Sequence, residues 1–76
     1  MFNGEQIREM LTAKDFKPFR ICMSDGHTYD ISNHDMALVS KNAVDIGLNP
    51  DPKGVAERFL RCALIHITRI EELQAA

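Results

Sequence analysis

Apolar residues near the start of the chain recur at the spacing of an α-helix. Ile7, Met10 and Leu11 lie three and four positions apart, with charged residues between them, so they would share one face. Asn3 is placed as an N-cap, and a glutamine three positions later completes a capping box. The pattern predicts a helix over about residues 4–13, whose narrow apolar stripe needs another element to pack on.

The next apolar positions alternate with polar ones on both sides of Asp25-Gly26, which is typical of a β-hairpin. A two-residue loop would place each apolar residue on a face with a polar one. A loop of residues 24–26 places apolar residues opposite each other: Ile21 opposite Tyr29, and Phe19 opposite Ile31. Because a slip of one residue exchanges the two faces of a strand, we expect the three-residue loop, with Gly26 at a bulge. The same register pairs Arg20 with Asp30.

Two further apolar runs, residues 35–40 and 43–48, predict a second hairpin. A two-residue loop places Val39 opposite Val44, whereas a three-residue loop places Leu38 opposite Val44. Both registers keep apolar residues together, so the pattern leaves the choice open.

The last part of the chain is ambiguous between helix and strand. After a loop at residues 49–56, which contains two prolines and a glycine, apolar positions fit a helical face, but many of these residues are β-branched and favour strands. Four earlier strands without a closing partner would leave exposed edges. We therefore expect a strand over about residues 58–63, a tight turn at 64–66 and a last strand to about residue 73, with a C-terminal helix as the alternative.

These elements predict a single domain over residues 1–76. It is mainly β, with an N-terminal helix on a small, strongly bent five-stranded antiparallel sheet or barrel over about residues 19–73. A chain of 76 residues buries only about 60–65% of the surface of its unfolded form. The core is therefore thin, and a partner or a second copy would bury more apolar surface.

Composition and charge narrow the functional classes. A net charge of −2 and a pI near 5.8 give no general attraction to nucleic acid or to an anionic membrane. No apolar run is long enough to span a bilayer, and the first residues lack the pattern of a signal peptide, so we expect a cytoplasmic protein. Cys22 and Cys62 lie outside any CxxC pair and are expected to be buried thiols, with a disulfide as the alternative for an exported chain.

Side chains capable of binding a metal are scattered along the chain: His27, His34, Asp35, Cys62 and His66. Their spacing matches no ligand pattern, and neighbours such as His34 and Asp35 would point to opposite faces of a strand. Cys62 and His66 would supply a nucleophile and a base, but no nucleophile elbow or oxyanion loop accompanies them. His66 is expected to be half-buried and bonded to backbone. We expect no catalytic residue, no metal and no cofactor.

Several segments resemble known groups of proteins. The segments KPFRI, MSDG, YDI and DMALVS, followed by IHITRIEEL, are similar to a group of short bacterial proteins of unknown function, which implies no biochemistry. The segments ICMSDGHTYDIS, HDMALV and FLRCALIHI resemble the Sm-like and SH3-like small barrels. This second resemblance implies a helix followed by five bent strands.

The residues that carry RNA binding in the Sm family are largely replaced here. Aligned on Met36, the positions of the stacking side chain and the base-binding asparagine hold Asp35 and Ala37. An anionic side chain stacks poorly beside phosphate, and alanine has no amide. The family's later Arg-Gly pair becomes Arg61-Cys62. The resemblance therefore favours the fold more than the RNA-binding function.

The sequence is best interpreted as a non-catalytic binding or assembly module that acts through an edge strand, a loop or self-association. Its expected partner is a protein or a second copy, without membrane contact. An RNA-binding Sm-like oligomer is the alternative, and a metal-binding protein or enzyme is third. The candidate interaction surface consists of His34, Asp35, Arg58, Arg61 and Arg69. The three arginines either form a basic patch or face solvent and balance nearby glutamates.

Overall fold

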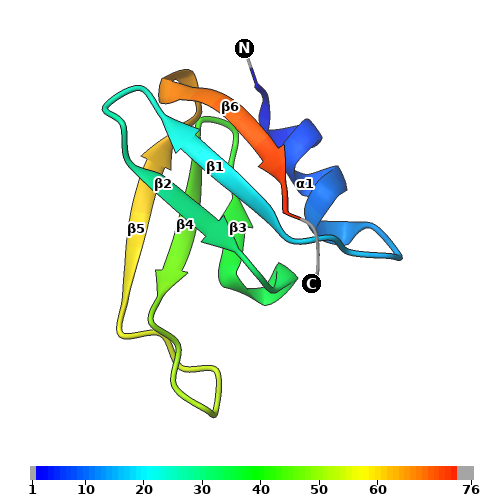
Figure 1. Cartoon of the computed structure of the whole chain (residues 1–76), viewed down its shortest axis with the longest axis vertical. Coiled ribbons are helices and arrows are strands. Elements are labelled where there is room, and N and C mark those ends of the chain that lie inside the picture. Colours follow the sequence, from blue (N-terminus) through cyan, green and yellow to red (C-terminus); the bar gives the residue numbers. More distant parts are fainter. Residues whose placement is uncertain (1, 74–76) are drawn as a thin grey trace.

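The computed structural model describes residues 2–73, so Met1 and residues 74–76 of the expected domain lie outside the described residues (Figure 1). This part of the chain contains one α-helix, six strands and two short 3-10 helices. In chain order they are α1 Gly4–Thr12, β1 Phe19–Met23, β2 Thr28–Ile31, η1 His34–Met36, β3 Ala37–Val39, β4 Ala43–Leu48, β5 Arg58–Ala63, η2 Leu64–His66 and β6 Ile67–Glu72. The mainly β class with an N-terminal helix is confirmed, and the last stretch is strand rather than helix.

The strands form two three-stranded antiparallel sheets, β2-β1-β6 and β3-β4-β5. The five-stranded barrel expected from the sequence is not confirmed, because the two sheets are not closed into a barrel and the strands number six. The tight turn expected at residues 64–66 is the 3-10 helix η2. It ends β5 beside β4 and redirects the chain so that β6 pairs with β1 in the other sheet (Figure 1).

The first hairpin has the register expected from the sequence. The paired residues are Ile21 and Tyr29, Phe19 and Ile31, and Arg20 and Asp30. The Gly26 N–H donates to the Met23 carbonyl at 3.0 Å, and Gly26 has a φ of 91°. Asp25 Oδ1 accepts the His27 N–H at 2.9 Å. Both residues of the Asp-Gly pair are thus explained by the turn, and the three-residue loop is confirmed.

The register of the second hairpin, which the pattern left open, is that of the two-residue loop. Val39 lies opposite Val44. The Ser40 N–H donates to the Ala43 carbonyl at 2.8 Å, and Ser40 Oγ accepts the Ala43 N–H at 3.2 Å. In this register Leu38 points to the outward side of the sheet and is 69% exposed.

The core lies between α1 and the inward faces of the two sheets. It consists of apolar residues from every sheet and from the helix: Ile7, Leu11, Phe19, Ile21, Ile31, Val44, Ile46, Cys62, Leu64 and Ile67. The capping box of α1 is confirmed, since Asn3 and Gln6 exchange two hydrogen bonds of 2.9 Å. Cys22 and Cys62 are buried free thiols, as expected. No helix within residues 2–73 has the length and apolar character needed to cross a membrane.

Candidate functional site

The five residues of the predicted interaction surface lie in three places. His34 and Asp35 are in η1, Arg58 and Arg61 are on β5, and Arg69 is on β6 in the other sheet. Arg58 and Arg61 are three positions apart on one strand, so they point to opposite faces. The structure therefore does not gather the three arginines into one patch.

His34 and Asp35 contact each other, contrary to the expectation for neighbours in a strand. The His34 Nδ1 atom lies 2.9 Å from Asp35 Oδ1, because both residues belong to a 3-10 helix rather than to a strand. Asn33 caps this helix by accepting the Asp35 N–H at 3.1 Å. Within residues 2–73, no group of three or more His, Cys, Asp or Glu side chains is arranged to hold a metal ion.

Two of the arginines are paired with carboxylates. Arg61 donates from Nε and Nη2 to the two carboxylate oxygens of Asp45 at 2.8 and 3.1 Å, and this hydrogen bonding holds the pKa of Asp45 below its usual value. Arg69 Nη2 lies 3.4 Å from Glu71 Oε1. The sequence predicts nearby glutamates as acidic neighbours of the arginines, but the partner Asp45 becomes visible only when β4 and β5 are placed in register.

Cys62 and His66 do not form a nucleophile and base pair. Cys62 is buried on the inward face, and this burial raises the pKa of its thiol, which disfavours the reactive thiolate. His66 is exposed, so the expected half-buried position bonded to backbone is wrong. Its Nδ1 atom instead lies 3.5 Å from Ser24 Oγ, because η2 turns the ring toward the β1–β2 turn.

The outer edge of β5 carries backbone groups that point away from the sheet. In an antiparallel pair a residue directs its N–H and C=O to the same neighbouring strand, and successive residues alternate. The Leu64 N–H donates to the Asn42 carbonyl at 2.9 Å, and these two residues continue the β4–β5 register. Even-numbered residues of β5 therefore bond to β4. The backbone groups of the remaining residues face outward: Phe59, Arg61 and Ala63.

The hydrogen bonds of the second hairpin independently give the same phase, that is, the same assignment of which β5 residues bond to β4 and which face outward. Ala43 bonds to Ser40, so the odd-numbered residues of β4 face β3 and the even-numbered ones face β5. Among the helices and strands of residues 2–73, β4 is the one element in extensive contact with β5. We call the outward-facing backbone of Phe59, Arg61 and Ala63 the β5 edge.

A cavity of about 470 Å³ borders the β5 edge on its inward side. One wall is β5 itself, and the other is the β1–β2 turn with Tyr29 and His66. Figure 1 shows the C-terminal end of β5 close to this turn. The two sheets thus approach each other here and leave a gap along the edge.

The outward face of the same sheet exposes large apolar side chains. Phe59 is 70% exposed and lies across Gly47, where the absence of a side chain leaves room for the ring. Leu38 lies on the same face, with the Asp45–Arg61 pair between the two apolar residues. The apolar pattern predicts a strand at Phe59, but the exposure of its ring becomes visible only when β5 is placed in register with Gly47 of β4.

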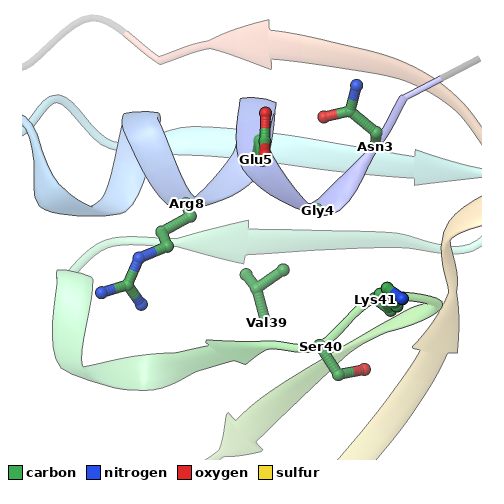
Figure 2. Close-up of a pocket in the computed structure, with 7 residues that line it drawn as sticks. All are labelled: Asn3, Gly4, Glu5, Arg8, Val39, Ser40 and Lys41. Atoms are coloured by element: carbon green, nitrogen blue, oxygen red, sulfur yellow. The ribbon is translucent and has the colours of Figure 1, made fainter.

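Two other cavities lie near this sheet. One of about 510 Å³ lies between Phe59, Met36 and the loop that contains Pro50, and Asp35 also lines it. The other, of about 530 Å³, lies where α1 meets the second hairpin (Figure 2). Asn3, one of its polar residues, is part of the capping box of α1, and Ser40, another, closes the turn of the second hairpin. The polar groups of both residues are therefore already used by the fold.

Within residues 2–73, the fold is a small antiparallel β structure in which the outer strand β5 is flanked by an exposed phenylalanine. None of the protein-family models, curated proteins or solved structures compared with the chain matches it. The resemblance to Sm-like and SH3-like barrels therefore stays a prediction, and the function has to be inferred from the edge itself.

Proposed function

We propose that this protein is a non-catalytic binding or assembly module that pairs an extended segment of a protein partner with the β5 edge. The observation that carries the proposal is the set of outward-facing backbone groups of Phe59, Arg61 and Ala63. Such a row of donors and acceptors is a template for an added strand. Backbone pairing supplies the affinity in this mode of binding, and side-chain pockets supply the specificity.

The surroundings of the edge suit the side chains of an added strand. These side chains alternate between the two faces of a sheet. On the outward face they would contact Phe59 and the guanidinium of Arg61, which Asp45 holds in place. On the inward face they would enter the cavity beside Tyr29 and His66. The favoured partner segment is therefore extended, with apolar residues at alternate positions.

The other outer strands are less suited to this role. Strand β3 has three residues and contacts α1, and β2 has four residues and carries the charged Asp30. Strand β6 ends in two glutamates. Short strands and charged side chains are common ways in which proteins prevent pairing at sheet edges. Strand β5 carries two arginines, but Asp45 of the neighbouring strand pairs with one of them, and β5 combines six residues with an exposed phenylalanine.

A peptide selection tests the proposal. A phage-displayed library of random dodecapeptides is selected on the purified chain, and each enriched peptide is then titrated against two variants, Arg61→Pro and Arg61→Ala. Both lack the arginine side chain, but only proline removes the outward N–H and blocks the approach of a strand. We expect the Arg61→Pro variant to bind the peptide at least about tenfold more weakly than the Arg61→Ala variant. This factor corresponds to the loss of one hydrogen bond between the N–H of residue 61 and the added strand.

A second proline variant serves as the matched control. Thr28→Pro alters the outer edge of β2, where the alternation also turns the N–H away from β1, and it should leave peptide binding unchanged. Amide signals of residues 59–63 should shift in nuclear magnetic resonance spectra on binding. Peptides that bind Arg61→Pro and Arg61→Ala equally well would overturn the proposal. So would a β5 edge that accepts neither a selected peptide nor a second copy.

A further inference from the structure

We infer that the segment that fits the β5 edge is β5 of a second copy, paired antiparallel about a two-fold axis at Leu60. This inference rests on the proposed function and names its partner. The result would be a continuous six-stranded sheet in the order β3-β4-β5-β5-β4-β3, in which the β5 edges of both copies are covered.

The phase of the backbone restricts the registers of such a pair. Outward donors and acceptors belong to Phe59, Arg61 and Ala63, so hydrogen-bonded partners in the two copies must come from this set or its continuation at Glu57. An antiparallel pair of identical strands is symmetric about one residue. Any residue of the strand can be such a centre. Centres at Phe59, Leu60 or Arg61 place both Phe59 and Arg61 opposite residues within 57–63, whereas centres nearer the ends of the strand do not.

Two of these registers have a specific fault. Centring at Arg61 places the two Arg61 side chains directly opposite each other, which is unfavourable for like charges. Centring at Phe59 leaves one hydrogen-bonded pair, the two Phe59 residues, that does not need the N–H of Glu57, whereas centring at Leu60 gives two such pairs between Phe59 and Arg61. The Glu57 N–H already donates to the Leu48 carbonyl at 2.9 Å.

The register centred at Leu60 is complementary on both faces. On the outward face, Phe59 of each copy lies opposite Arg61 of the other, so a guanidinium can lie against the aromatic ring. Asp45 binds that guanidinium through both of its oxygens and so orients it before pairing. On the inward face, the two Leu60 side chains lie opposite each other. No two like charges face each other directly.

Burial also favours a second copy over the open monomer. Phe59 is 70% exposed, and Leu60 is only partly buried beside the cavity at the edge. Pairing about Leu60 brings the Phe59 and Leu60 side chains of each copy into contact with the second copy. For a chain whose own core consists of few residues, this contact adds stability by mass action.

Sedimentation equilibrium over a concentration series tests association. We expect a species of twice the monomer mass of 8.6 kDa, with Arg61→Pro associating at least about tenfold more weakly than Arg61→Ala. Thermal unfolding of each variant at low concentration checks that it folds. Thr28→Pro is again the matched control and should associate like the original chain.

Disulfide trapping tests the register. In the Leu60-centred pair the two Leu60 residues form a non-hydrogen-bonded pair, whose Cα atoms lie about 4.5 Å apart, within the range for a disulfide. We expect Leu60→Cys to give a covalent dimer under mild oxidation, whereas Phe59→Cys and Arg61→Cys do not. Trypsin cleaves after Arg61 and so separates the thiol introduced at position 60 from Cys62, which allows mass spectrometry to locate the bond.

The outcomes separate the inference from the proposed function. A chain that stays monomeric up to about 1 mM, but binds selected peptides in an Arg61→Pro-sensitive way, overturns the second-copy inference and leaves the proposed function standing. A dimer that Arg61→Pro does not weaken, or that is trapped by Phe59→Cys or Arg61→Cys instead of Leu60→Cys, also overturns the inference.

Discussion

Proline substitution at Ala63 tests whether the β5 edge is open in the single chain. Ala63 has a φ of −68° and a ψ of 132°, which lies within the range that the proline ring imposes, about −65 ± 15°. Its N–H faces away from β4, so the substitution removes no hydrogen bond of the sheet. Cys62, the preceding residue, is in a strand, a conformation that a following proline accepts.

The expected effect of Ala63→Pro on stability is small and favourable. Proline at a compatible position reduces the conformational freedom of the unfolded chain and raises the free energy of unfolding by about 0.4–1 kcal/mol. Cys62→Pro provides the contrast, because the Cys62 N–H faces Val44 in β4. Its loss leaves a carbonyl of the sheet unpaired, and we expect a decrease of about 1–3 kcal/mol beyond the effect of Cys62→Ala.

Urea denaturation at low micromolar protein measures these effects on the monomer. Because the chain contains one tyrosine and no tryptophan, far-ultraviolet circular dichroism is the suitable signal. A loss of stability in Ala63→Pro comparable to that in Cys62→Pro would mean that the Ala63 N–H is already bonded within the chain. That result would refute the assigned phase of β5 and, with it, the open edge.

Three other contacts give predictions that are independent of the edge. Gly4→Ala would place a Cβ atom 2.7 Å from the Ser40 carbonyl oxygen. Such overpacking costs about 1–3 kcal/mol, which exceeds the gain in helix propensity of at most about 1 kcal/mol, so we expect a lower midpoint of thermal unfolding. A variant as stable as the original chain would contradict this close approach. Because its arginine partner lowers the pKa of folded Asp45 from the usual 3.8, the stability that this carboxylate contributes is present above that value and is lost as the pH falls below it. Urea midpoints measured from neutral to acidic pH should therefore decline less steeply for Asp45→Asn, and identical declines would exclude the effect. Burial raises the pKa of the Cys62 thiol, so a disulfide reagent should modify it much more slowly in the folded chain than in urea, and equal rates would show that the thiol is accessible.

The elements predicted correctly from the sequence are those determined by neighbouring residues. The capping box depends on Asn3 and Gln6 alone, and the loop of residues 24–26 depends on an alternating pattern and one glycine. The register of the second hairpin was undecided because β4 is central in its sheet and buried on both sides. A strand of this kind loses the alternation that selects a register, so the Ser40–Ala43 hydrogen bonds provided the missing information.

The candidate site depends on contacts between strands that the sequence pattern does not specify. Arg61 is part of the candidate surface expected from the sequence, which stays a prediction, but its partner Asp45 and the outward direction of its N–H follow only from the order β3-β4-β5. The strand order also separates the three arginines, so it favours the alternative in which they face solvent beside acidic neighbours over the single basic patch. Arg69 belongs to the other sheet, because η2 redirects the chain between β5 and β6.

The distribution of protective features among the strands argues that the open edge of β5 has a use. Unpaired edges promote unwanted association, and proteins usually shorten, charge or cover them. Here β3 is short and contacts α1, while β2 is short and carries the Arg20–Asp30 pair. Strand β5 also carries an arginine–aspartate pair, but it is twice as long as β3, contains an exposed phenylalanine and, within residues 2–73, has no extensive contact with α1. Because its outward N–H groups make no bonds to β4, the edge can be blocked with little loss of stability in the monomer. Binding and folding are therefore separable at this strand, which makes the proposed role testable by single substitutions.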